Sequence, residues 1–224
     1  MCALKEELGS LRRFETRSFQ RVGLEVHELE LDGARLLACV GGVGKVHAAR
    51  AATVLLNEGA LRGLLVVGVC GGLRQNLPPG TLVHCTRAVQ TDFARREGRE
   101  LDADLELRSA WNAVATGPAG WFLTADRPVL SLWRRLQLAR AFTGPCVADM
   151  ETAAIASVAT AAAVPWAALR AVTDRATVFG HASFRLHFPS QAGRCADTVV
   201  PLLAELAADP AASGRAHCSR RVPR

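Results

Sequence analysis

The sequence predicts an α/β protein of three layers, with helices on both faces of a central mixed β-sheet. Short apolar segments typical of strands alternate along the chain with longer helical segments, as in a layered α/β/α domain. The aliphatic run 64–69 has the composition of a strand buried on both faces. Strands over 25–31 and 34–40, joined by the turn signal Asp32-Gly33, predict an early hairpin and therefore a sheet that is not purely parallel.

The other elements are predicted from apolar periodicity and from turn residues. Beyond the hairpin, the predicted strands are 64–69, 81–89, 121–124 and 166–173. The predicted helices are 45–57, 130–142, 150–163 and 191–208. Residues 94–120 show no clean period, and we expect a loop with some helix there.

Length and charge define the domain organisation. The chain of 224 residues fits one large domain, which we place at 1–208, followed by a basic tail at 209–224 that we expect to be disordered. The net charge of +6 comes largely from this tail, whose last fourteen residues contain four arginines and no acid. Without these arginines, 23 basic residues stand against 21 acidic ones, so we expect no nucleic acid as a partner.

Hydropathy and cysteine usage indicate the compartment. No apolar run reaches the roughly 18 residues of a membrane-spanning helix, and no signal sequence opens the chain, so we expect a soluble protein without a membrane partner. The seven cysteines are widely spaced and include no C-x-x-C pair, which disfavours a disulfide framework and structural zinc. A reducing cytoplasm is the expected location.

Four acidic residues are candidates for a functional site. In layered α/β sheets, ligands bind outside the carboxyl ends of the strands. Asp174 directly follows the strand 166–173, and Asp149 and Glu151 lie where the strand near 147 becomes a helix. Glu7 precedes an apparent helix at the start of the chain. Taken singly, each of the four is better explained as a helix-start acid or cap than as a catalytic residue.

The glycine-rich segment Gly41-Gly42-Val43-Gly44-Lys45 follows a strand but matches neither the P-loop nor the dinucleotide fingerprint. It predicts a tight strand-to-helix turn, and a phosphate or ribose contact through its backbone N–H groups stays open. The histidines show no metal-ligand spacing, so we expect no metal, and no G-x-S-x-G elbow is present.

Five segments together resemble the nucleoside phosphorylase/nucleosidase superfamily, and most closely its bacterial 5'-methylthioadenosine/S-adenosylhomocysteine nucleosidases. In chain order they are Ala3-Leu4-Lys5-Glu6-Glu7-Leu8, Gly41–Val46, Val67-Gly68-Val69-Cys70-Gly71-Gly72-Leu73, Asp149-Met150-Glu151 and Arg170-Ala171-Val172-Thr173-Asp174. The resemblance covers about residues 3–208. It implies a nucleoside phosphorylase-like fold, with a central mixed sheet that is partly barrel-like.

The resemblance implies hydrolysis of the N-glycosidic bond of a purine nucleoside, without metal or organic cofactor, by a protein that forms a homodimer. Asp174 would protonate N7 of the leaving purine, while Glu7, helped by Arg170, would orient and deprotonate the attacking water. Glu151 would accept hydrogen bonds from the ribose hydroxyls, and Met150 would pack against the sugar. The other substrate-binding residues implied are Asp149, Val69 and Gly71, with Val43, Leu4 and Phe184 lining the apolar 5' end.

The sequence departs from its relatives at the positions that distinguish water from phosphate as nucleophile. Val66 and Val69 stand where related hexameric phosphorylases carry an Arg and a Ser that hold phosphate, which favours hydrolysis over phosphorolysis. The nucleosidases also carry a Ser where Val69 stands. Arg127-Pro128 stands where an aromatic residue stacks on the base, and residues 91–98 diverge as well. Alternatives are therefore a phosphorylase, a nucleosidase for another 5'-substituted nucleoside such as futalosine or an adenosyl lipid, and a catalytically silent nucleoside-binding relative.

The N-terminus is short for the superfamily, whose first strand should precede Ala3. Only Met1 and Cys2 stand there. We expect either a start upstream or a sheet lacking one edge, and in the second case a poorly positioned Glu7.

Overall fold

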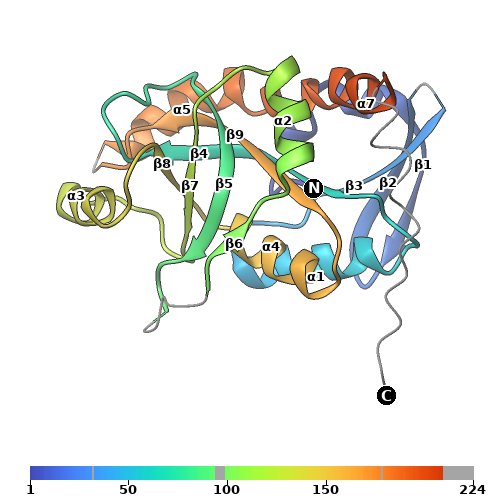
Figure 1. The fold of residues 1–224 in the computed structure, drawn as a ribbon, viewed down its shortest axis with the longest axis horizontal. Helices are drawn as coiled ribbons and strands as arrows, with labels where there is room; N and C mark the ends of the chain where they lie inside the picture. Colours follow the sequence, from blue (N-terminus) through green and yellow to red (C-terminus); the bar gives the residue numbers. More distant parts are fainter. Residues whose placement is uncertain (32, 94–98, 178, 209–224) are drawn as a thin grey trace.

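The computed structural model describes residues 1–31, 33–93, 99–177 and 179–208, which form two sheets flanked by helices (Figure 1). The six-stranded sheet has the order β6-β5-β7-β8-β4-β9, and β5 also pairs with β9, so five of its strands close into a barrel. These strands are β4 (Leu64–Gly72), β5 (Leu82–Gln90), β6 (Leu101–Asp102), β7 (Ala119–Thr124), β8 (Cys146–Asp149) and β9 (Trp166–Asp174). The predicted α/β class with a mixed, partly barrel-like sheet is confirmed.

A separate three-stranded antiparallel sheet contains the predicted hairpin. Its strands are β1 (Glu15–Arg21), β2 (Leu24–Leu31) and β3 (Ala34–Cys39), in that order. The hairpin is confirmed, although Asp32 of its turn lies outside the described residues. It was wrongly assigned to the central sheet, whose mixed character comes instead from the antiparallel pairs β4–β8, β5–β9 and β5–β6. No apolar pattern indicates β1 in the sequence, because its residues are nearly all exposed and lack apolar alternation.

Helices cover the central sheet on two sides. On one side, α1 (Lys45–Leu56) packs against α4 (Thr152–Ala161), and on the other α2 (Leu105–Val114) packs against α7 (Val199–Ala208) (Figure 1). A further helix, α3 (Leu132–Ala141), lies at the end of the molecule away from the three-stranded sheet. The predicted helices 45–57, 130–142 and 150–163 correspond to α1, α3 and α4, and the expected helical part of 94–120 is α2.

The predicted continuous helix 191–208 is wrong. The helix α5 (Gly180–Gln191) ends where that helix was expected to begin, and two helices follow it, α6 (Arg194–Asp197) and α7. Gly193 lies between α5 and α6, and a Cβ at this residue would lie 2.7 Å from the Cα of Gly9, so a tertiary contact requires glycine here. A contact between chain segments that far apart leaves no local apolar pattern. The predicted tail 209–224 lies outside the described residues.

The first three residues are built into the sheets, which corrects the expectation of a poorly positioned Glu7. The Met1 ammonium donates to the Leu65 carbonyl at 2.8 Å, and the Val67 N–H donates to the Met1 carbonyl at 3.0 Å. On its other side, Cys2 forms an isolated parallel bridge with Val40. Met1–Ala3 therefore runs between the three-stranded sheet and β4, and it fixes the start of the 3-10 helix η1 (Lys5–Phe14), which contains Glu7.

Two further observations concern the described residues as a whole. None of their helices is long and apolar enough to cross a membrane. Six of the cysteines are described, and all six are buried and free of disulfide bonds.

Candidate active site

The guanidinium of Arg170 is the centre of a buried cluster of charged groups. Arg170 lies in β9 and is 2% exposed. Its Nη2 donates to Glu151 Oε2 at 3.1 Å and lies 3.4 Å from Asp149 Oδ2, while its Nη1 donates to the Val69 carbonyl at 3.0 Å. Burial opposes the charge, but the carboxylates of Asp149 and Glu151 and that of Glu7 raise the pKa of Arg170 above its ordinary value. Arg170 is therefore a permanent positive charge among carboxylates.

Glu7 is held by three backbone N–H groups. It is the third residue of η1, and its Oε2 turns back to accept from the N–H groups of Ala3 at 2.8 Å and Leu4 at 2.9 Å. Its Oε1 accepts from the N–H of Val69 in β4 at 3.0 Å. Glu7 therefore caps its own helix and ties that helix to the barrel. The carboxylate is 1% exposed, and its orientation is fixed from both sides.

Asp149 and Glu151 lie where β8 meets α4, as the sequence predicted. Glu151 is the N-cap residue of α4, and its Oε1 accepts from the N–H of Gly44 at 3.0 Å. Burial raises the pKa of Glu151, and the positive charge of Arg170 opposes that shift.

Asp149 is engaged entirely within the protein. Its Oδ1 accepts from the Thr124 hydroxyl at 2.5 Å, and its Oδ2 accepts from the hydroxyl and the N–H of Thr152. With Arg170 beside it, its side chain has no exposed area. Asp149 therefore orients the side chains of Arg170 and Thr152. Glu151, by contrast, is bound to the glycine turn at residues 41–45.

Asp174 is the last residue of β9, at the carboxyl end of the strand. Its Oδ1 accepts from the Ala176 N–H at 2.7 Å, and its Oδ2 is paired with the Thr173 hydroxyl at 3.1 Å. Burial raises the pKa of Asp174, although these two hydrogen bonds oppose the shift. A Cβ at Gly71 or Gly180 would lie 3.2 Å from Oδ1, so glycine backbone flanks the carboxyl group closely on two sides.

The remaining predicted substrate residues differ in how closely they join this cluster. Val69 has both backbone polar groups bound to it, and Leu4 contributes its N–H to Glu7. Met150 lies between Asp149 and Glu151 and is half-buried. Val43 precedes Gly44 in the glycine turn and is 45% exposed. Phe184 lies on α5, where it stacks on Phe188 with ring centroids 4.8 Å apart. The structure records no hydrogen bond or ring contact that joins Phe184 to the described carboxylates.

Lys45 joins three loops beside the site, a feature absent from the sequence prediction. Its Nζ donates to Asp92 Oδ1 at 2.8 Å and to Gln90 Oε1 at 3.2 Å, and its backbone N–H donates to Asp126 Oδ1 at 2.9 Å. The N–H of Asp126 in turn donates to Asp92 at 3.0 Å. The N–H groups of Gly44 and Lys45, considered above as phosphate ligands, are therefore bound to carboxylates. Asp92 and Asp126 follow β5 and β7, so the strand-end rule used for Asp174 would have found them.

Among the described residues, no group of three or more His, Cys, Asp or Glu side chains is arranged to hold a metal ion.

Comparison with models of known protein families identifies the family of this chain. The family model of the phosphorylase superfamily matches residues 1–204. The chain belongs to the phosphorylase superfamily.

Relatives within the phosphorylase superfamily match over nearly the whole chain. The sequence is 26% identical over 219 residues to the 5'-methylthioadenosine/S-adenosylhomocysteine nucleosidase of Haemophilus ducreyi, covering 90% of this chain and 94% of that protein. The fold is similar to that of futalosine hydrolase of Helicobacter pylori, with a TM-score of 0.86, 21% identity and coverage of 92% of this chain and 96% of the other. The same four values apply to the 5'-methylthioadenosine/S-adenosylhomocysteine nucleosidase of that organism with butyl-thio-DADMe-Immucillin-A.

The close approach of β4 to the cluster can be tested at Gly68, whose φ is +152°. A Cβ there would lie 2.6 Å from Glu7 Oε1 and 2.9 Å from Arg170 Nη1. Gly68→Ala should therefore lower the free energy of unfolding by roughly 1–3 kcal/mol more than a matched control, since overpacking adds to the backbone cost. Gly59→Ala is that control, because its φ is +135° and nothing lies within 4 Å of its Cβ. Equal losses in urea denaturation would contradict the predicted clash.

Proposed function

We propose that the protein hydrolyses the N-glycosidic bond of a purine nucleoside of the 5'-methylthioadenosine/S-adenosylhomocysteine type and releases the base. One observation carries the proposal. Asp174, a carboxyl group whose pKa is raised, lies at the end of the same strand whose Arg170 holds the carboxylate of Glu151, with Glu7 alongside. The match to nucleosidases such as that of Haemophilus ducreyi supports this chemistry.

Asp174 is the proposed general acid. A purine leaves the sugar more readily when N7 is protonated, so the acid must carry a proton near neutral pH. Burial favours the protonated carboxyl group of Asp174. The flanking glycines leave backbone rather than side chains around the carboxyl group, which allows a flat base to approach it.

The proposed sugar-binding residue is Glu151. Glycosidic cleavage passes through a transition state that resembles an oxocarbenium ion, which a nearby carboxylate stabilises. Arg170 and the Gly44 N–H fix the Glu151 carboxylate before substrate arrives, so no reorganisation is needed during the reaction. Met150, next to Glu151, is the proposed apolar contact with the ribose. Leu4, Val43 and Phe184 are proposed to line the 5' end.

Glu7 is proposed to orient and deprotonate the attacking water. An ionised carboxylate accepts about four hydrogen bonds, and backbone N–H groups supply three of those made to Glu7. One acceptor position is left for a water molecule, in an orientation that the backbone fixes.

Phosphate is a poor alternative nucleophile at this site. The Val69 N–H, a potential donor to an anion, is already bound to Glu7. Arg170 is surrounded by carboxylates, so a dianion placed beside it would be repelled by Glu7 and Glu151. These contacts support water as the nucleophile, in agreement with the valines that replace the phosphate-binding residues of the hexameric phosphorylases.

We also propose that two copies associate as a homodimer in the cytoplasm, as the resemblance implies. Exposed apolar side chains beside the glycine turn support the dimer, since Val43 is 45% and Val46 78% exposed. The buried free cysteines support a reducing compartment. Light scattering of the purified protein should give twice the chain mass, and a monomer at all concentrations would contradict the dimer.

Incubation with 5'-methylthioadenosine should release adenine at the same rate with and without inorganic phosphate, and the sugar product should carry no phosphate. Chromatography of the products measures both. Dependence on phosphate would identify a phosphorylase instead. S-adenosylhomocysteine and futalosine, tested in parallel, identify the preferred 5' group, and the absence of base release from every purine nucleoside would contradict the proposed activity.

Asp174→Asn should lower kcat by roughly 10²–10⁴-fold, the usual contribution of a general acid. In the unchanged protein, kcat/KM should fall as the pH rises through the raised pKa of Asp174, because only the protonated form donates. The residual activity of Asp174→Asn should lack this decline. Asp102→Asn is the matched control, because that side chain is 71% exposed and paired with Arg87 on the surface. A variant at Asp174 that retains full activity would refute its role.

A further inference from the structure

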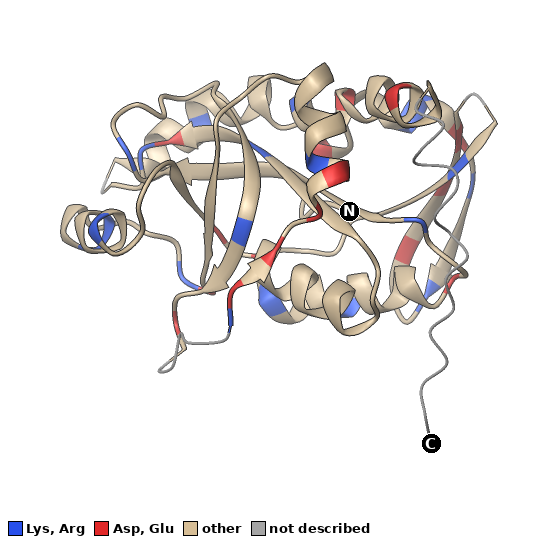
Figure 2. Ribbon diagram, viewed as in Figure 1, with Lys and Arg blue, Asp and Glu red and all other residues tan. Residues whose placement is uncertain are grey.

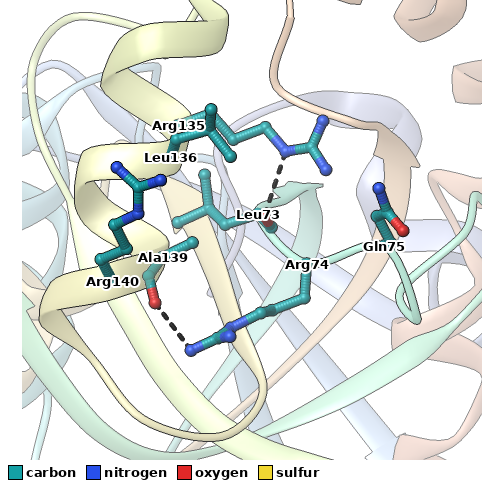
Figure 3. Close-up of a pocket in the computed structure, with 7 residues that line it drawn as sticks. All are labelled: Leu73, Arg74, Gln75, Arg135, Leu136, Ala139 and Arg140. Carbon is teal, nitrogen blue, oxygen red and sulfur yellow. Dashed lines mark hydrogen bonds between the residues drawn. The ribbon is translucent and has the colours of Figure 1, made fainter.

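An arginine-lined pocket lies between the turn after β4 and the helix α3. It has a volume of about 480 Å³. Its lining residues are Leu73, Arg74, Gln75, Arg135, Leu136, Ala139 and Arg140 (Figure 3). None of these residues belongs to the carboxylate cluster around Arg170 or contributes to the function proposed above.

The pocket is positively charged without a counter-charge from its own segments. The chain contains no Asp or Glu between residues 59 and 91 or between 127 and 148, and these two stretches supply the whole lining. Figure 2 shows basic but no acidic residues on α3. Within the described part of the chain, no ion pair joins Arg74, Arg135 or Arg140 to a carboxylate. Three guanidinium groups therefore share the pocket without neutralisation.

Arg135, the most deeply buried arginine of this pocket, has hydrogen-bond donors that are not used within the described part of the protein. Arg135 is 8% exposed, and its Nε donates to the Leu73 carbonyl at 3.0 Å (Figure 3). No hydrogen bond within the described residues uses either of its Nη atoms. Neither Nη atom is a buried atom without a partner, so both reach solvent and can donate to an anion that enters the pocket.

Arg74 is fixed in place by the end of α3. Its Nη2 donates to the carbonyls of Ala139 at 2.6 Å and Phe142 at 2.7 Å, at the carboxyl end of the helix. The side chain is therefore pre-ordered, and an anion that meets it incurs little of the entropy cost of ordering it. Arg140 lies at the exposed rim of the same pocket.

We propose that this pocket binds a phosphate group, either as inorganic phosphate or as part of a small phosphomonoester. The planar fork of an arginine matches phosphate oxygens with paired donors, and Arg135 has both Nη atoms available for this. Gln75 adds an amide donor at the edge of the pocket. Leu73, Leu136 and Ala139 form an apolar wall that suits the organic part of a phosphomonoester. This second site goes beyond the proposed hydrolysis and does not depend on it.

Calorimetric titration of the full chain with inorganic phosphate, ribose 5-phosphate and ribose, at constant ionic strength, tests the proposal. The two phosphate-bearing probes should bind at one saturable site, and uncharged ribose should not bind there. Tighter binding of ribose 5-phosphate would identify a phosphomonoester as the ligand, and equal affinities would identify inorganic phosphate. Absence of saturable binding by both probes would overturn the proposal.

Variants locate the site. Arg135→Gln and Arg140→Gln should each weaken phosphate binding at least tenfold, and Arg135→Lys should also weaken it, because lysine keeps the charge but lacks the fork. Arg134→Gln is the matched control on the same helix, since Arg134 is bound to Gln137 and the Thr91 carbonyl outside the pocket. Because Arg140 is exposed, its variant tests the site even if substitution of the buried Arg135 impairs folding. Equal affinities of the Arg140 and Arg134 variants, or competition between phosphate and adenine, would overturn the assignment.

Discussion

The buried guanidinium of Arg170 is the interaction on which the candidate active site depends. It binds the carbonyl of Val69 in β4 and the carboxylate of Glu151 at the start of α4, and it lies beside Asp149 at the end of β8. A positive charge at this depth is stable only because these groups surround it. Removal of either sign would leave the other uncompensated, so the whole cluster is expected to behave as one unit.

Closure of the barrel fixes the relative positions of the charged side chains in the cluster. β9 pairs with β4 on one side and with β5 on the other, so Arg170 and Asp174 lie on a strand that is hydrogen-bonded along both edges. Glu7 lies on η1, outside the barrel strands. Its hydrogen bond from the Val69 N–H fixes the position of its carboxylate relative to β4. Asp174, Glu151 and Glu7, which we propose as general acid, sugar-binding carboxylate and water-orienting carboxylate, therefore belong to one rigid frame, as preorganised catalysis requires.

Much of this arrangement could be predicted from the sequence, and the omissions share a cause. The positions of Asp149, Glu151 and Asp174 at strand ends could be predicted because each follows an apolar segment, a pattern that local sequence retains. The contact of Gly193 with Gly9 joins distant segments, and β1 is exposed along nearly its whole length, so neither leaves an apolar pattern in the local sequence. The partnership of Glu7 with Val69 likewise spans 62 residues of chain. The short N-terminus misled the prediction because hydrogen bonds to Leu65 and Val67 cannot be seen in composition.

The Lys45 network has a consequence for how such a protein can change over time. It joins the loops after β3, β5 and β7 through a few partly exposed polar contacts, which are individually weak. These loops can therefore be rebuilt by mutation with little loss of stability, whereas the barrel strands cannot. Substitutions can accumulate in these loops while the carboxylate cluster around Arg170 stays unchanged.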